Sequence, residues 1–139
     1  MLPYGELESK IWDHEFEIFV PAAASRLITR DQVDRMINAK LEVFSCGANV
    51  PFDDPEIFFG PTGFYADQKF SVIPDFIANC GMARVFAHFM ENEVNMDDAS
   101  IFSDISQTIR NALVKTYSMN QKKTGIAQKS FEIAIKQLL

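Results

Sequence analysis

A strand–helix–strand pattern in the first third of the chain constrains the fold most. Residues 16–21 (Phe-Glu-Ile-Phe-Val-Pro) predict a strand that ends at a proline, as is typical. Four of its first five residues are apolar, which favours an inner strand. Thr29 and Gln32 fit a capping box for a helix over residues 30–39. Residues 41–46 predict a second strand. This order within roughly 30 residues indicates a βαβ unit, so we expect parallel strands and a right-handed crossover.

A third strand is expected after a long irregular stretch. Residues 47–70 are rich in glycine and proline, so they predict loops, with a short helical turn near 55–59. Residues 70–74 (Phe-Ser-Val-Ile-Pro) then predict a short strand that is again closed by proline.

The remainder of the chain predicts helices. Residues 76–92 carry apolar side chains on nearly all sides, which indicates a buried helix; they are Phe76, Ile77, Cys80, Val85, Phe86, Phe89 and Met90. Asp97 or Asp98 is suited to cap the next helix, whose apolar residues recur every four positions; they are Ile101, Ile105, Ile109, Leu113 and Tyr117. Gly125 should separate it from a last amphipathic helix over 126–139, with Phe131, Ile135 and Leu138 toward one side.

Composition excludes several classes of protein. The 13 Lys and Arg against 19 Asp and Glu give a net charge of −6, which disfavours a nucleic-acid binder. No apolar run approaches the roughly 18 residues of a membrane span, and no signal peptide is visible at the start. Two cysteines are too few for a disulfide framework, so we expect a reducing, cytoplasmic environment.

Motifs for common catalytic chemistry are missing from these 139 residues. The glycines do not fit G-x-G-x-x-G, and no Gly-Lys pair forms a Walker loop. His14 and His88 lack ligand spacing for zinc, and His88 is read as a core or rim histidine rather than a catalytic one. Cys80 is expected to pack, whereas Cys46 stands at a strand end where exposure would allow reaction. The Asp53-Asp54 pair is more typical of a turn or helix cap than of acid/base catalysis.

Three motifs stand in order, each at the end of a predicted strand. They read Phe19-Val20-Pro21-Ala22-Ala23, Cys46-Gly47-Ala48-Asn49-x-Pro51, and Val72-Ile73-Pro74-Asp75-x-x-x-Asn79-x-Gly81. Together they resemble the C-terminal half of the nucleotide-binding domain of the glutamate/leucine/phenylalanine/valine dehydrogenases. The resemblance covers about residues 16–92, and a C-terminal helical segment over about 96–139 is compatible with it.

The resemblance implies an α/β fold: a partial, half Rossmann-like parallel sheet of about three strands with flanking helices, in one domain over 1–139. It further implies that NAD or NADP binds at the strand ends in the intact enzyme, where open parallel sheets hold their ligands. Ala22 and Ala23 would lie beside the nicotinamide or ribose, and the amides of Asn49 and Asn79 would bind a ribose hydroxyl or a carboxamide. The alternative is that both asparagines only cap turns and helices.

The resemblance also places the amino-acid side-chain pocket on the helix after Asn79. The corresponding positions are Ala83 and Phe86, which are three residues apart and would share one helix face. Phe86 would narrow the pocket, and simple core packing is the alternative for it. Met82 replaces the second glycine of the family's N-A-G-G motif, so a close approach of the backbone to a ligand is in question there.

The family's substrate domain, glycine-rich turn and catalytic lysine and aspartate have no counterpart in this sequence, so we assign no catalytic residue. We expect a C-terminal portion of an NAD(P)-dependent amino-acid dehydrogenase that shows negligible turnover alone; detectable amino-acid oxidation with NAD would contradict this. The first strand would then leave an apolar edge open, so we expect self-association into a homo-oligomer. A ligand-binding or oligomerisation module without catalysis is the alternative function.

Overall fold

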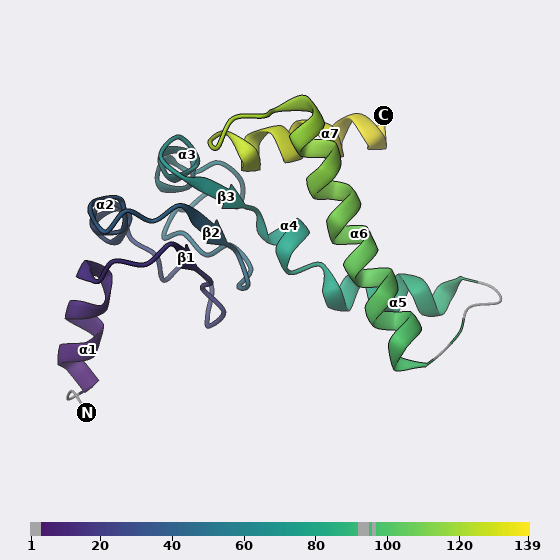
Figure 1. The fold of residues 1–139 in the computed structure, drawn as a ribbon, viewed down its shortest axis with the longest axis horizontal. Helices are drawn as coiled ribbons and strands as arrows, with labels where there is room; N and C mark the ends of the chain where they lie inside the picture. The colour runs from purple at the N-terminus through teal and green to yellow at the C-terminus, as the bar shows by residue number, and fades with distance from the viewer. Residues whose placement is uncertain (1–3, 92–94, 96) are drawn as a thin grey trace.

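The computed structural model describes residues 4–91, 95 and 97–139 and contains one small parallel sheet with helices around it (Figure 1). The strands are β1 (Ile18–Phe19), β2 (Val43–Ser45) and β3 (Ser71–Ile73). The helices are α1 (Tyr4–Lys10), α2 (Arg30–Asn38), α3 (Pro61–Asp67), α4 (Asp75–Ala78), α5 (Gly81–Met90), α6 (Asp98–Met119) and α7 (Ile126–Leu138), and a 3-10 turn spans Ile11–Asp13.

The sheet has the order β1-β2-β3, and both neighbouring pairs are parallel. The predicted α/β fold with about three parallel strands, a partial Rossmann-like sheet, is therefore confirmed. Within the described residues β1 pairs with β2 alone, so the prediction of an inner first strand is wrong for this sheet. The side chain of Ile18 in β1 is 63% exposed, and that of Val20, just after the strand, is 54% exposed, because no described strand or helix covers them.

The core lies on one face of the sheet. Phe19, Phe44 and Val72 are neighbours across the three strands, and Phe44 is completely buried. Phe44 stacks on the ring of Phe52 at 5.0 Å between centroids and also packs against Phe70 at 6.0 Å. From α2, Val33 and Met36 complete this core, also without solvent exposure.

Helix α2 begins as predicted. The Thr29 hydroxyl accepts a hydrogen bond from the Gln32 backbone N–H at 3.3 Å, and the Gln32 side chain accepts from the Thr29 N–H at 2.9 Å. This reciprocal pair is the capping box expected from the sequence.

Helix α3 differs from the expected turn near 55–59, because the helix begins later, at Pro61. Proline is favoured in the first helical turn, where its missing N–H is not needed. The buried Asp54 carboxylate accepts from the N–H groups of Thr62 at 3.0 Å and Gly63 at 2.9 Å. Asp54 therefore caps α3, in agreement with the reading of Asp53-Asp54 as a turn or cap.

The single buried helix predicted over 76–92 is wrong in two respects. It is broken at Asn79 and Cys80 into α4 and α5, and its predicted end near 92 lies outside the described residues, as does residue 96. Four large apolar side chains of α5 are also exposed rather than buried: Met82, Phe86, Phe89 and Met90. Apolar side chains on all sides favour burial of a helix, but they do not supply a neighbouring segment to bury it. In the described residues α5 packs on α6 along one side, which leaves its other sides exposed (Figure 1).

The last two helices, α6 and α7, lie where the sequence predicts them, but the side chains that they bury differ from the prediction. The Asp97 carboxylate accepts from the Ser100 N–H at 2.9 Å and caps α6, as predicted. Tyr117 of the expected apolar stripe is exposed. Helix α7 buries Ala127, Ser130 and Ile133 rather than the face of Ile135 and Leu138, because small residues allow close packing; the Ser130 hydroxyl lies 3.0 Å from that of Thr116 on α6.

Asp67 joins α3 to the start of α7. Its buried carboxylate accepts from the N–H groups of Ala127 and Gln128, both at 3.0 Å, and its carbonyl accepts from Gly125 N–H at 2.7 Å. Gly125 adopts a left-handed conformation, with φ of 73°, that suits glycine at this turn. Burial raises the pKa of Asp67 above its ordinary value, while the two side-chain bonds from N–H groups act in the opposite direction.

Candidate functional site

The carboxyl ends of the three strands lie on the same side of the molecule, where α4 begins (Figure 1). The turns after β1 and β2 are in close contact: a Cβ added to Gly47 would lie 3.0 Å from the Pro21 carbonyl oxygen and 3.2 Å from the Ala22 Cβ. Glycine therefore suits this close approach of two backbones, since a Cβ would force its neighbours to move by a few tenths of an ångström. The contact brings Ala22 beside the loop that carries Asn49.

The turns after β2 and β3 meet through the two asparagines that the sequence singled out. The Asn79 Nδ2 amide donates to the Asn49 Oδ1 oxygen at 2.7 Å, and both side chains are exposed. Asn79 is the C-cap of α4, and its side chain turns toward the 47–51 loop across 30 residues of sequence. The structure thus brings the side chains of Asn49 and Asn79 together at neighbouring strand ends.

Asp75 holds the loop that carries Asn49. One carboxylate oxygen accepts from the Val50 N–H at 2.8 Å, and the other accepts from the Phe76 N–H at 2.8 Å. Asp75 belongs to the third motif, but its sequence context gave it no functional role. The signal that could have identified it is an aspartate placed directly at the start of a helix, where such residues accept backbone N–H bonds.

The other predicted site residues are not drawn into this contact. Ala23 is exposed one residue beyond Ala22. Ala83 and Phe86 lie on α5, beyond the break in the helix, and are both exposed, so the alternative that Phe86 is a core residue is wrong. The side chains at 83 and 86 are three residues apart and share one face of α5, as expected.

Both cysteines are free thiols; Cys46 is buried and Cys80 is half-buried. Cys46 is buried, and burial is the main reason that the pKa of its thiol is raised far above its ordinary value, with the nearby carboxylates of Asp75 and Asp67 adding to the effect. A buried neutral thiol is a poor nucleophile, so the possibility of an exposed reactive Cys46 is not met. Cys80 is half-buried and not oxidised.

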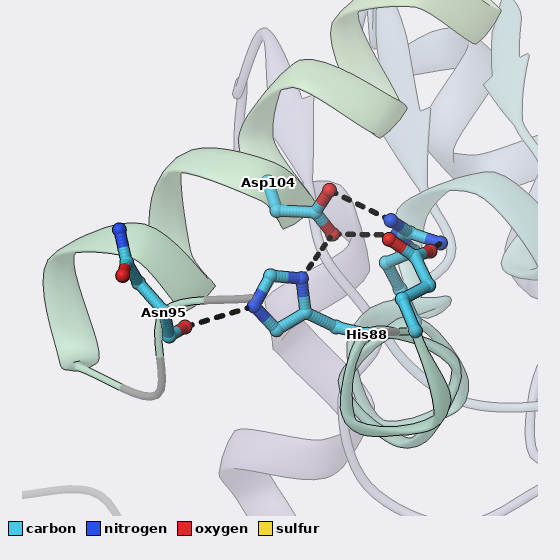
Figure 2. A network of polar contacts seen from close by, with 5 residues as sticks. His88, Asn95 and Asp104 are labelled. Atoms are coloured by element: carbon cyan, nitrogen blue, oxygen red, sulfur yellow. Dashed lines mark hydrogen bonds and ion pairs between the residues drawn. The ribbon is translucent and has the colours of Figure 1, made fainter. Parts of the chain in front are cut away.

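His88 lies in a network of charged groups between α5 and α6 (Figure 2). Its Nε2 is 3.1 Å from the Asn95 carbonyl oxygen, which can only accept, so Nε2 carries the proton. Its Nδ1 lies 3.9 Å from the Asp104 carboxylate and has no hydrogen-bond partner within the described residues. His88 is buried, which agrees with the reading of a core or rim histidine.

Arg84 of α5 connects the two helices through its ion pair with Asp104 of α6. It donates to both oxygens of Asp104, at 2.5 and 2.8 Å, and pairs with Glu91 at 2.8 Å. These contacts hold the pKa of Asp104 below its ordinary value, because a neighbouring guanidinium favours the carboxylate. Since the arginine already neutralises the carboxylate, the network fastens α5 to α6.

Among the described side chains, no group of three or more His, Cys, Asp or Glu is arranged to hold a metal ion. Of the helices described above, none combines the length and hydropathy of a membrane span.

The end of the sheet brings together residues of all three motifs. A small side chain follows β1, and the amides after β2 and β3 are paired.

Comparison with known proteins agrees with these motifs. Comparison with curated proteins gives no match. The family model described as Glutamate/Leucine/Phenylalanine/Valine dehydrogenase matches residues 3–139, well beyond the range of about 16–92 expected from the motifs. With its parallel sheet, its three strand-end motifs and a match over nearly its whole length, the chain belongs to the glutamate/leucine/phenylalanine/valine dehydrogenase family.

Proposed function

We propose that this chain forms the C-terminal part of the NAD(P)-binding domain of an amino-acid dehydrogenase. The reaction is the oxidative deamination of an L-amino acid to a 2-oxo acid and ammonia, in which the bound nicotinamide accepts a hydride. Membership of the family supports the class of reaction. The parallel sheet supports a ligand site at the strand ends, where α/β sheets bind nucleotides.

The hydrogen bond between Asn79 and Asn49 carries the proposal. Because Asn79 donates its Nδ2 to Asn49 Oδ1, the pair retains an amide donor on Asn49 and a carbonyl acceptor on Asn79. A donor next to an acceptor complements a primary carboxamide or two neighbouring hydroxyl groups. Nicotinamide riboside carries both of these groups, so the pair fits that end of the dinucleotide.

The small residues after β1 fit the same group. Ala22 and Ala23 are exposed and follow a strand whose end is packed against Gly47, so a flat ring can approach the backbone there. The pyrophosphate is assigned to none of these 139 residues, because the glycine-rich turn that would bind it is not in the sequence. Ala83 and Phe86 are assigned to the amino-acid side chain, on the exposed face of α5.

The test is a titration of the 15N-labelled chain with nicotinamide mononucleotide, NAD and NADP. We expect nicotinamide mononucleotide to shift the side-chain amide signals of Asn49 and Asn79, and adenosine monophosphate to leave them unchanged. Substitution of both residues, N49A with N79A, removes two neutral hydrogen bonds to the ligand at about 1 kcal/mol each, so the Kd should rise at least about tenfold.

The matched control is a second amide pair far from the strand ends. On α6 the exposed Gln107 Nε2 donates to Asn111 Oδ1 at 2.6 Å, so N111A removes a comparable contact outside the site. N111A should bind nicotinamide mononucleotide like the unchanged chain. The proposal fails if adenosine monophosphate shifts the same two amides, or if none of these ligands does.

The open edge of β1 supports oligomerisation as a second function. Ile18 and Val20 are exposed there, and the unpaired backbone of an edge strand is a template for another chain. We expect light scattering to show a mass above that of the monomer, increasing with concentration. The variants I18K and V20K, which place charges on the edge, should restore the monomer; a monomeric parent chain at high concentration would contradict this role.

A further inference from the structure

The residue after Asn49 has an unusual backbone conformation. Val50 has a φ of 44°, in the left-handed region. Among the described non-glycine residues with positive φ, it is the one with a β-branched side chain; the others are Arg26, Lys40 and Phe59. A β-branched residue is strongly disfavoured there, so it persists only where its surroundings hold it.

Val50 is held on both sides. Its N–H donates to the Asp75 Oδ2 oxygen at 2.8 Å, and its carbonyl accepts from the Arg26 N–H at 2.8 Å. The next carbonyl, that of Pro51, accepts from the N–H groups of Leu27 at 3.1 Å and Ile28 at 3.0 Å. The loop is therefore fixed between the segment after β1 and the start of α4.

Asp75 bonds to the residue after Asn49 and to Asn79 itself. Its side chain accepts the N–H of Val50, the residue next to Asn49, and its main-chain carbonyl accepts the N–H of Asn79 itself at 2.7 Å. One residue thus fixes the backbone beneath each member of the amide pair. The side-chain bond between Asn49 and Asn79 therefore joins two segments whose backbones both bond to Asp75.

We propose that Asp75 is a positioning residue that holds Val50 in its left-handed conformation and thereby aims the Asn49 amide at Asn79. In this proposal Asp75 makes no contact with the ligand; it fixes the positions of the Asn49 amide N–H and the Asn79 carbonyl oxygen, which bind the ligand. The inference rests on the proposed nicotinamide site for its functional meaning, whereas its geometry is testable in the free protein.

The test uses the full chain with the variant D75A and with the double variant D75A/V50G. D75A removes both carboxylate oxygens, which accept from the N–H groups of Val50 and Phe76. Glycine adopts the left-handed conformation without the steric cost of valine, so V50G should restore the loop where Asp75 is missing. In D75A the side-chain amide signals of Asn49 and Asn79 should collapse toward the positions of free asparagine, without any ligand present, and nicotinamide mononucleotide should bind roughly tenfold more weakly. In D75A/V50G both signals should return toward those of the unchanged chain.

D67A is the matched control, because Asp67 also accepts two backbone N–H bonds but lies before β3, whereas Asp75 follows it. It should lower the unfolding temperature and leave both asparagine signals in place. The return of both signals in D75A/V50G separates positioning of the loop from general destabilisation, and it should be seen even if D75A alone does not fold.

Unchanged signals in D75A, or signals that stay lost in a folded D75A/V50G variant, would overturn the positioning role. Failure of the unchanged chain to bind nicotinamide mononucleotide would overturn the proposed function instead, since the signals of the free protein report on Asp75 alone.

Discussion

Replacement of Phe44 by alanine is expected to destabilise the protein by about 3–5 kcal/mol, the usual cost of removing a buried aromatic side chain. Phe44 is completely buried on the central strand and packs against the rings of Phe19, Phe52 and Phe70. Their centroids lie 5.0–6.0 Å away on three different segments, so the cavity cannot close by the movement of one side chain. Domains of this kind have a total stability of about 5–15 kcal/mol, so this is a large share.

Urea unfolding followed by circular dichroism measures this loss as a lower midpoint at an unchanged slope. Phe102 on α6 is the matched control, because it is 68% exposed and F102A removes the same atoms without opening a cavity. Its stability should stay within about 0.5 kcal/mol of the parent chain. A similar loss in both variants would show that Phe44 is not at the centre of the core.

Replacement of Gly60 by alanine is expected to cost about 3 kcal/mol, from overpacking together with the loss of a helix cap. A Cβ at this position would lie 2.3 Å from the Asp54 Cβ and 2.6 Å from its carboxylate carbon. Asp54 cannot move aside without releasing the N–H groups of Thr62 and Gly63, which it caps at the start of α3. Helix α3 should therefore fray in the variant.

G81A provides the control, because a Cβ added at Gly81 meets no atom within 4 Å. At this helical position alanine should be neutral or stabilise the protein by up to about 1 kcal/mol. Thermal unfolding of both variants gives the comparison, and amide signals of α3 locate the damage in G60A. Equal unfolding temperatures for the two variants would show that Asp54 and Gly60 can separate freely.

The sequence predicted those parts of the fold whose signals are local. The capping box of Thr29 and Gln32 and the proline or glycine after each strand act within a few residues, so the βαβ unit and the third strand could be located. The exposed faces of β1 and α5 could not be predicted, since apolar periodicity shows which side chains favour burial but not whether another segment covers them.

The functional site divides in the same way. Asn49 and Asn79 could be found because the strand-end motifs resemble a family, and their contact follows from the parallel order of β2 and β3. The position of Asp75 at a helix start could indicate a cap, but its contact with Val50 could not be found, because that N–H group lies 25 residues earlier in the chain. Asp67 likewise bonds to α7 across 60 residues. Such pairings depend on the folded backbone and have no periodic signature.

The sheet and the α5–α6 pair should respond to salt in opposite directions. The core around Phe44 is apolar, and a salting-out anion such as sulfate strengthens apolar burial. Helices α5 and α6 are joined by Arg84 with Asp104 and Glu91, whose side chains remain 25–49% exposed, so mobile ions screen their attraction. At high ionic strength the strand ends that carry the amide pair become firmer, while the helix that carries Ala83 and Phe86 is held less tightly.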